Sequence, residues 1–138
     1  MRAARRPGGA FMNIKHIAVY VSDLETMKDF YIRYFGATAN QGYYNPVTGL
    51  RTFFLAFDGE VRLEIMSRPD MTKVAKEALQ TGFAHLAFGV GSREKVDQRT
   101  ALLKADGYTI AGPPRVTGDG YYESVVLDPE GNRIEITE

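Results

Sequence analysis

The chain contains an internal repeat, and this repeat constrains its fold more than any other feature. The sequence HIAVYV, which begins at His16, is echoed by HLAFGV, which begins at His85. Likewise RLEIM around Glu64 is echoed by RIEIT around Glu135. The His and the Glu of one half are 48 positions apart, and those of the other half are 50 apart. The repeat predicts two fused halves with similar folds, each holding one imidazole and one carboxylate.

Length and composition describe an ordinary globular chain. Its 138 residues have the usual size of one domain, and 44% are hydrophobic and 25% charged. A net charge of 0 gives no electrostatic reason to expect nucleic acid or an anionic membrane as a partner. The absence of cysteine excludes disulfides, thiolate metal ligands and a thiol nucleophile. It is compatible with the cytoplasmic location that we expect.

The organisation along the chain follows from the repeat. We expect residues 1–12 to be a disordered tail, since they carry three Arg and the run Pro7-Gly8-Gly9 and lack the apolar core of a signal peptide. Residues 13–138 are expected to form a single domain with halves at 13–67 and 83–138. The connector between the halves, residues 68–82, has apolar residues at helical spacing and is predicted to be helical.

Each half has the pattern of a strand, a helix and three further strands. Residues 14–21 alternate between two faces, which predicts a strand, and a capping-box spacing at Ser22 followed by Gly36 predicts the limits of a helix. Further elements are predicted at 38–44, 51–57, 60–66, 83–90, 92–106 (the second helix), 108–111, 121–127 and 132–137. The predicted fold class is α+β, with two βαβββ modules forming a cupped mixed sheet and helices on its outer face.

The repeated polar residues form a candidate metal site. If their apolar strand neighbours pack under the helices, the four polar side chains lie together on the opposite, concave face. Alone, a strand His is usually structural and a strand Glu usually solvated, but these are the only two His in the chain and both occupy the same place in the repeat. The candidate ligands are His16, Glu64, His85 and Glu135. Two imidazoles and two carboxylates suit one divalent Zn, Ni, Co, Mn or Fe ion.

The paired halves, the opening HIAVYVSDL and the closing DPEGNRIE resemble the vicinal oxygen chelate superfamily. This superfamily includes glyoxalase I, methylmalonyl-coenzyme A epimerase, extradiol dioxygenases, fosfomycin-resistance enzymes and bleomycin-resistance proteins. The resemblance covers about residues 13–138 and implies that the family's metal ligands correspond to the same four residues. Because the dioxygenases and fosfomycin enzymes have no ligand at the position of Glu64, the chain is most similar to the glyoxalase I branch.

This resemblance implies a metal-dependent lyase or isomerase, similar to lactoylglutathione lyase. Such an enzyme transfers a proton next to a carbonyl through a metal-stabilised enediolate. The implied base is Glu135, with Glu64 on the opposite side for the return step. A small-molecule substrate and a homodimer are also implied, and the sequence leaves open whether a site forms within one chain or between two.

Four further residues are candidate substrate contacts: Tyr20, Arg68, Arg115 and Tyr122. Bacterial glyoxalase I members have an Arg in place of Tyr20, and Tyr20 cannot supply the positive charge that helps to hold the γ-glutamyl carboxylate of glutathione. This argues against glutathione as co-substrate. Arg68 can receive a carboxylate or a phosphate, while Arg115 and Tyr122 are expected near loops at the mouth of a cavity.

Two other functions remain open from the sequence. A metal-free protein that binds a drug or another small molecule would hold no stoichiometric metal and would bind its ligand equally well after Glu135→Gln. An iron-dependent extradiol dioxygenase would consume dioxygen with a catechol and would depend little on Glu64.

Overall fold

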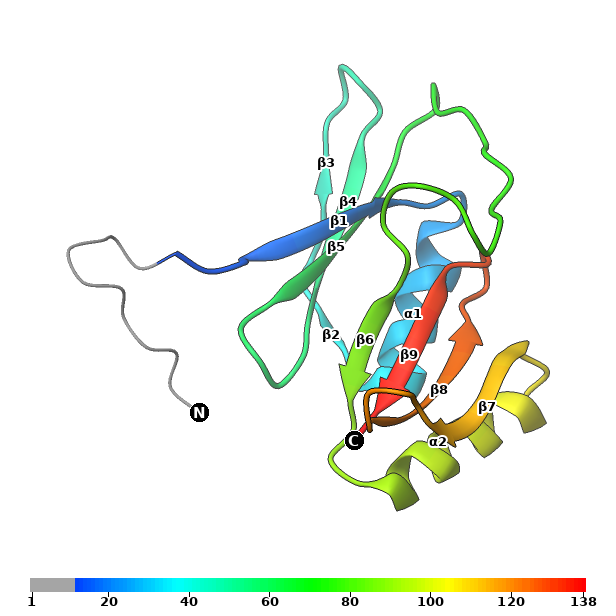
Figure 1. Cartoon of the computed structure of the whole chain (residues 1–138). Helices are drawn as coiled ribbons and strands as arrows, with labels where there is room; N and C mark the ends of the chain where they lie inside the picture. Colours follow the sequence, from blue (N-terminus) through cyan, green and yellow to red (C-terminus); the bar gives the residue numbers. More distant parts are fainter. Residues whose placement is uncertain (1–11) are drawn as a thin grey trace.

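The computed structural model describes residues 12–138 and confirms the α+β class and the two modules (Figure 1). The first module contains β1 (His16–Tyr20), α1 (Leu24–Phe35), β2 (Thr38–Ala39), β3 (Tyr43–Tyr44), β4 (Arg51–Ala56) and β5 (Arg62–Ser67). The second contains β6 (Leu86–Gly89), α2 (Arg93–Ala105), β7 (Ile110–Val116), β8 (Tyr122–Leu127) and β9 (Arg133–Thr137). Apart from Met12, the predicted tail lies outside the described residues. Within those residues, neither helix is long and apolar enough to cross a membrane.

Each module is closed by a parallel pairing between its first and last strands. The first sheet has the order β1-β5-β4-β2, with β3 also paired to β4, and the second has the order β6-β9-β8-β7. The β1–β5 and β6–β9 pairs are parallel, whereas the other pairs are antiparallel. As a result β1 and β6 each stand at the edge of a sheet, beside the strand that carries the Glu of the same half.

Helix α1 begins and ends at residues suited to those positions. The side chain of Asp23 accepts a hydrogen bond from the Thr26 backbone N–H at 3.0 Å, so Asp23 is the N-cap and not Ser22, as the capping-box spacing predicted. At the other end Gly36 has a φ of 67°, a left-handed conformation that a residue without a Cβ adopts at little cost.

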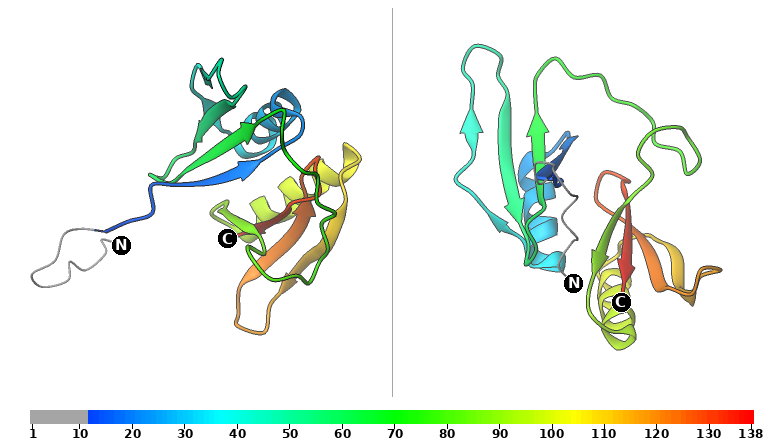
Figure 2. Two further views of the ribbon diagram at one scale, coloured as in Figure 1. Left: turned by 90° about the horizontal axis from the view of Figure 1, so that it is seen from above. Right: turned by 60° about the vertical axis from the view of Figure 1, so that its left-hand side comes forward.

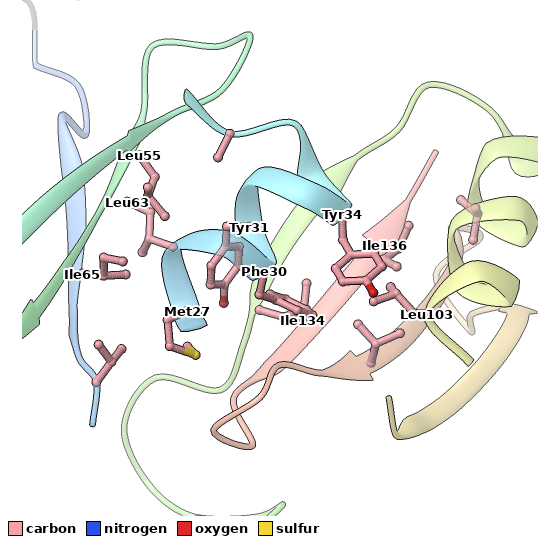
Figure 3. Packing of buried hydrophobic residues seen from close by; sticks show 14 residues of the cluster. Met27, Phe30, Tyr31, Tyr34, Leu55, Leu63, Ile65, Leu103, Ile134 and Ile136 are labelled. Atoms are coloured by element: carbon pink, nitrogen blue, oxygen red, sulfur yellow. The ribbon is translucent and has the colours of Figure 1, made fainter. Parts of the chain in front are cut away.

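Helix α1 also forms the centre of the core (Figure 3). Its buried side chains recur at helical spacing and are Met27, Phe30, Tyr31 and Tyr34. The helix packs against β4 and β5 of its own sheet, where Leu55, Leu63 and Ile65 are buried. It also reaches the second sheet, because the rings of Phe35 and Phe88 stack at 4.4 Å. Helix α2 packs on the second sheet alone, whereas α1 lies between the two sheets (Figure 2).

Three segments differ from their predicted secondary structure. The strand predicted at 108–111 is β7, which covers Ile110–Val116. The strand predicted over 38–44 is divided into β2 and β3, because the Asn40 side chain accepts the Phe54 and Gly42 backbone N–H groups and Gly42 has a φ of 83°. The connector at 68–82, which arches between the halves in Figure 2, contains turns and bends and no helix. Its Val74 and Leu79 are 72% and 97% exposed, and a short helix without packing is only marginally stable.

The β8–β9 turn fastens the second half to α1. The carboxylate of Glu130 accepts the backbone N–H of Ser22 at 2.7 Å and that of Asp23 at 2.8 Å, which are donors at the start of α1. In the same turn the buried carboxylate of Asp128 accepts the Tyr31 hydroxyl at 2.9 Å. Burial raises the pKa of Tyr31, so its hydroxyl remains a donor. We call these contacts the inter-half latch.

Removing the buried hydroxyl of the latch should destabilise the whole domain. We expect Tyr31→Phe to lower the free energy of unfolding by about 1.5–3 kcal/mol, because the charged Asp128 carboxylate loses a buried donor. Urea denaturation followed by circular dichroism measures this change. Tyr121→Phe is the matched control, since Tyr121 is 58% exposed. Equal stability of the two variants would contradict the role assigned to the latch.

Candidate metal centre

The first His–Glu pair lies on neighbouring strands of the first sheet. In the β1–β5 register Ala18 stands beside Glu64, and His16 precedes Ala18 by two positions on the same face. The His16 Nε2 and the Glu64 Oε1 are 4.0 Å apart, with side chains 43% and 16% exposed. The His16 ring also meets the edge of Phe54 at a centroid distance of 5.3 Å. The imidazole is therefore held in place while remaining accessible.

The second pair repeats this arrangement in the second sheet. His85 directly precedes β6, and Ala87 stands beside Glu135 of β9 in the parallel register. The His85 Nε2 and the Glu135 Oε2 are 3.1 Å apart, with side chains 40% and 18% exposed. Two ligands at about 2.1 Å from one ion lie about 3.0–3.4 Å from each other in octahedral or tetrahedral geometry. The separation of the second pair fits that range, and the first pair is slightly wider.

The two pairs belong to different sheets. Within residues 12–138 of one chain, no three His, Asp or Glu side chains lie close enough together to hold a metal ion. The structure therefore brings each predicted His together with the Glu of its own half, but it does not bring the four residues to one point. Each pair supplies half of the predicted ligand set.

A further acidic residue lies beside the second pair and was not predicted. Glu123 of β8 stands opposite Thr137 in the β8–β9 register. This pair is the neighbour of the Val125–Glu135 pair, and Glu123 lies on the same face of the sheet as Glu135. Burial raises the pKa of Glu123, and the negative charge of Glu135 raises it further. Strand alternation in the sequence places Glu123 and Val125 on one face. Only the β8–β9 register shows that this is also the face of Glu135.

Among the candidate substrate contacts, Arg115 and Tyr122 lie on different faces of the second sheet. Arg115 of β7 stands opposite Glu123 in register and its positive charge acts on that carboxyl, so it shares the face of the His–Glu pair. The Tyr122 hydroxyl instead donates to the Asp97 carboxylate of α2. Tyr122 thus lies on the helix side, away from the pair.

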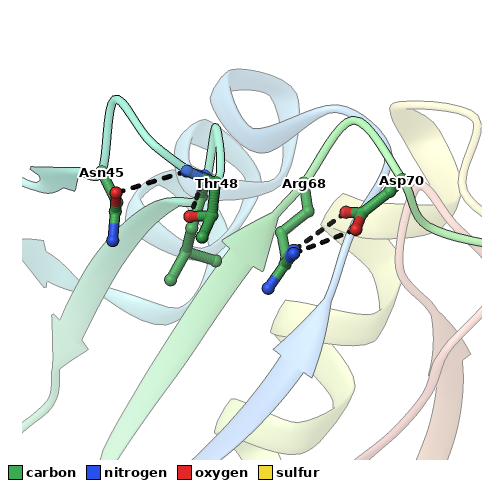
Figure 4. A network of polar contacts seen from close by, with 5 residues as sticks. Asn45, Thr48, Arg68 and Asp70 are labelled. Carbon is green, nitrogen blue, oxygen red and sulfur yellow. Dashed lines mark hydrogen bonds and ion pairs between the residues drawn. The ribbon is translucent and has the colours of Figure 1, made fainter.

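The other two candidates lie near the end of the first sheet. Tyr20 is 54% exposed and shares the face of His16, four positions further along β1. Arg68, just beyond β5, donates from Nε and Nη2 to the two carboxylate oxygens of Asp70, each at 2.9 Å (Figure 4). This bidentate pairing raises the pKa of Arg68 and balances its charge locally. The structure therefore gives Arg68 a partner within the chain.

The fold and the two pairs define a protein of two βαβββ modules with one His–Glu pair on each. Residues 13–136 match the Glyoxalase/Bleomycin resistance protein/Dioxygenase superfamily, and the chain belongs to this family. It is 35% identical over 126 residues to the uncharacterized protein YwkD of Bacillus subtilis (strain 168), covering 91% of this chain and 96% of YwkD.

Solved structures show the same fold. The glyoxalase family protein from Enterococcus faecalis has a TM-score of 0.74 and 27% identity, with 93% of this chain and 98% of that protein covered. Glyoxalase I from Zea mays has a TM-score of 0.75 and 23% identity. The match covers 90% of this chain but only 43% of the maize chain, so this similarity concerns the fold alone.

Replacing the third carboxyl should stabilise the metal-free protein at neutral pH. Because the pKa of Glu123 is raised in the folded state, its protonated form favours folding, and this contribution is lost as the pH rises through the raised value. We expect Glu123→Gln to raise the free energy of unfolding at pH 7 by less than about 1 kcal/mol, since solvent screens the repulsion.

The gain should disappear near pH 4, where the carboxyl of the unfolded chain is itself protonated. Urea denaturation at both pH values, with a chelator present, measures the effect. Glu60→Gln is the control, because Glu60 lies in the exposed turn between β4 and β5. A gain that is the same at both pH values would show that charge is not its cause.

Proposed function

We propose that the protein is a metal-dependent lyase or isomerase of the glyoxalase type, which transfers a proton next to a carbonyl of a small substrate. The observation that supports this function is the repeated His–Glu pair. In both halves the His is about two-fifths exposed and the Glu is less than one-fifth exposed. Each His lies in or directly before the strand that pairs in parallel with the strand of its Glu. A duplicated scaffold would retain its apolar pattern without retaining both polar pairs.

We further propose that two copies of the chain complete each site. The strands next to the two Glu residues, β1 and β6, stand at sheet edges. An edge strand presents unpaired backbone N–H and C=O groups, which favour pairing with another chain. Placing β1 of one copy beside β6 of the other would join the half-sites, and two-fold symmetry would form two equivalent centres.

The donor set suits a borderline divalent cation. Imidazole nitrogens and carboxylate oxygens bind Zn, Ni, Co, Mn or Fe, and the pairs His16–Glu64 and His85–Glu135 would supply four ligands. When bound, the ion supplies positive charge that stabilises oxygens next to the carbon that loses its proton. The partial exposure of both His side chains leaves substrate oxygens a path to the centre.

The carboxylates of Glu135 and Glu64 would carry out the proton transfer. One oxygen of Glu135 lies near His85, which leaves the other oxygen to accept the proton from the carbon. Glu64, from the other half of the centre, would return the proton from the opposite side. Both side chains are mostly buried, and a carboxylate shielded from water is a stronger base toward a bound substrate.

Removing both imidazoles should abolish metal binding and catalysis together. The family also contains bleomycin-resistance proteins, so activity has to be measured directly. We expect wild-type protein purified without chelator to hold a divalent metal and to exchange solvent deuterium into a hemithioacetal, an α-hydroxy-thioester or an acyl-coenzyme A ester. The His16→Ala/His85→Ala variant should hold no metal and exchange at least about 100-fold more slowly. Wild-type protein that binds neither added zinc nor nickel would overturn the proposal.

Mixing two defective chains should restore part of the metal binding. One chain carries His16→Ala and Glu64→Gln, and the other carries His85→Ala and Glu135→Gln. If each centre joins halves of different chains, a mixed dimer has one intact centre and one centre without ligands. Random pairing after coexpression should then recover about one quarter of the wild-type metal content, whereas each variant alone recovers none. No recovery in mixed dimers isolated through two affinity tags would show that a centre is built within one chain.

A further inference from the structure

The repeat contains a third polar position, which the proposed metal centre does not use. In both halves an Arg precedes the Glu by two positions, at Arg62 and Arg133. Because alternate residues of a strand share a face, each Arg lies on the same face as its Glu. Arg62 stands beside His16 in the β1–β5 register, and Arg133 lies one position before the β6–β9 ladder begins, as His85 does. Each His–Glu pair is therefore accompanied by a cation.

An aromatic ring of the neighbouring strand holds Arg62 in place. The Arg62 guanidinium lies 4.3 Å from the centre of the Phe54 ring, which is a cation–π contact. The His16 imidazole stands perpendicular to the same ring, with 5.3 Å between the ring centroids. One side chain thus contacts both the cation and the imidazole. In the second sheet Val125 occupies the position of Phe54, so Arg133 has no such ring beside it.

The charge of Arg62 has no ion-pair partner within residues 12–138. The acidic residues two positions away on either side, Glu60 and Glu64, form no ion pair with it, and neither does any other carboxylate in that range. Arg68 differs, because two of its nitrogens donate to the carboxylate of Asp70 (Figure 4). A stacked guanidinium keeps the N–H donors at its edge available, and their spacing matches the two oxygens of a carboxylate.

The charges around the candidate centre favour an anionic group at Arg62. Glu64 and Glu135 would neutralise a divalent cation, and Arg62 would then leave one positive charge uncompensated in the first half. One positive charge matches a carboxylate, whereas a phosphate monoester carries about 1.5–2 negative charges. Arg62 is exposed and lines the cleft between the halves, so a second group of a bound substrate can approach it.

We propose that Arg62 binds a carboxylate that the substrate carries in addition to the oxygens that would coordinate the metal. The substrate class is therefore a hydroxy or oxo acid with a second carboxylate. Arg62 and Glu64 are two residues apart in β5, about 7 Å along the strand, so a few carbon atoms can separate the two ends of the substrate. The inference rests on the proposed function, because the metal centre would hold the other end.

The acid 2-hydroxyglutarate and its 5-amide provide a matched pair of probes. Both offer the same hydroxyl and carboxylate to a metal, and they differ only in the charge of the far end. Isothermal titration of the full chain with added zinc should show the acid binding about tenfold more tightly than the amide. Arg62→Gln should reduce this ratio to about twofold. Arg62→Met, whose apolar chain can still cover Phe54, should reduce it equally.

Arg51→Gln is the control for the loss of charge. The Arg51 guanidinium also lies over an aromatic ring, 4.9 Å from the centre of Tyr44. Arg51 is three positions from Phe54 in β4 and so lies on the opposite face of the sheet. Its replacement should leave the acid-to-amide ratio unchanged. Equal loss in the Arg51 and Arg62 variants, a ratio that survives both Arg62 replacements, or a ratio near one in the wild type overturns the role of Arg62.

Titrations without metal separate this role from the proposed function. If both probes bind only with zinc and with equal affinity, the metal centre stands and the role of Arg62 is overturned. If the acid is preferred, loses its preference in both Arg62 variants and is unaffected by zinc, the role of Arg62 stands and the metal-dependent function fails. Absence of binding of the acid in both conditions overturns the role of Arg62.

Discussion

The parallel pairing of the first and last strands within each half is the contact on which the rest of the structure depends. Parallel strands cannot be joined by a tight turn, so the intervening helix and strands have to cross between them. The ladder then brings together residues that are about 50 positions apart and places each His beside a Glu. It also leaves the opening strand of each half at a sheet edge, so the strand next to each Glu is the one that can meet another chain.

The two halves share the same order of strands but differ in the side chains around each His–Glu pair. Glu64 stands opposite the Phe54 ring, whereas Glu135 stands opposite Val125, with Glu123 nearby. The repeated positions are those that hold the sheets and the His–Glu pairs. The positions that differ lie around them on the same face, where a small molecule bound at the pairs would extend. Duplication thus accounts for the two His–Glu pairs, and divergence between the copies accounts for the different side chains around them.

The internal repeat predicted the two modules and the Glu that accompanies each His, and local alternation and helical spacing predicted the elements within each module. They did not predict the latch, since nothing near Ser22 indicates that its N–H meets Glu130 from the other half. They also placed Tyr122 near the mouth of a cavity, although its hydroxyl binds Asp97 on α2. The face of a residue near a strand end depends on the register of the sheet, which is a long-range property.

The latch has a consequence for the order in which the chain folds. Its three contacts join residues 97, 107 and 108 positions apart, which are long separations for a chain of 138 residues. During synthesis α1 emerges about a hundred residues before the β8–β9 turn, so the Tyr31 hydroxyl and the amides at the start of the helix lack their latch partners until that turn has been made. Contacts of this separation slow folding and couple distant segments. The first half is therefore expected to remain incompletely packed on the ribosome, and the two copies of the repeat fold as one cooperative unit.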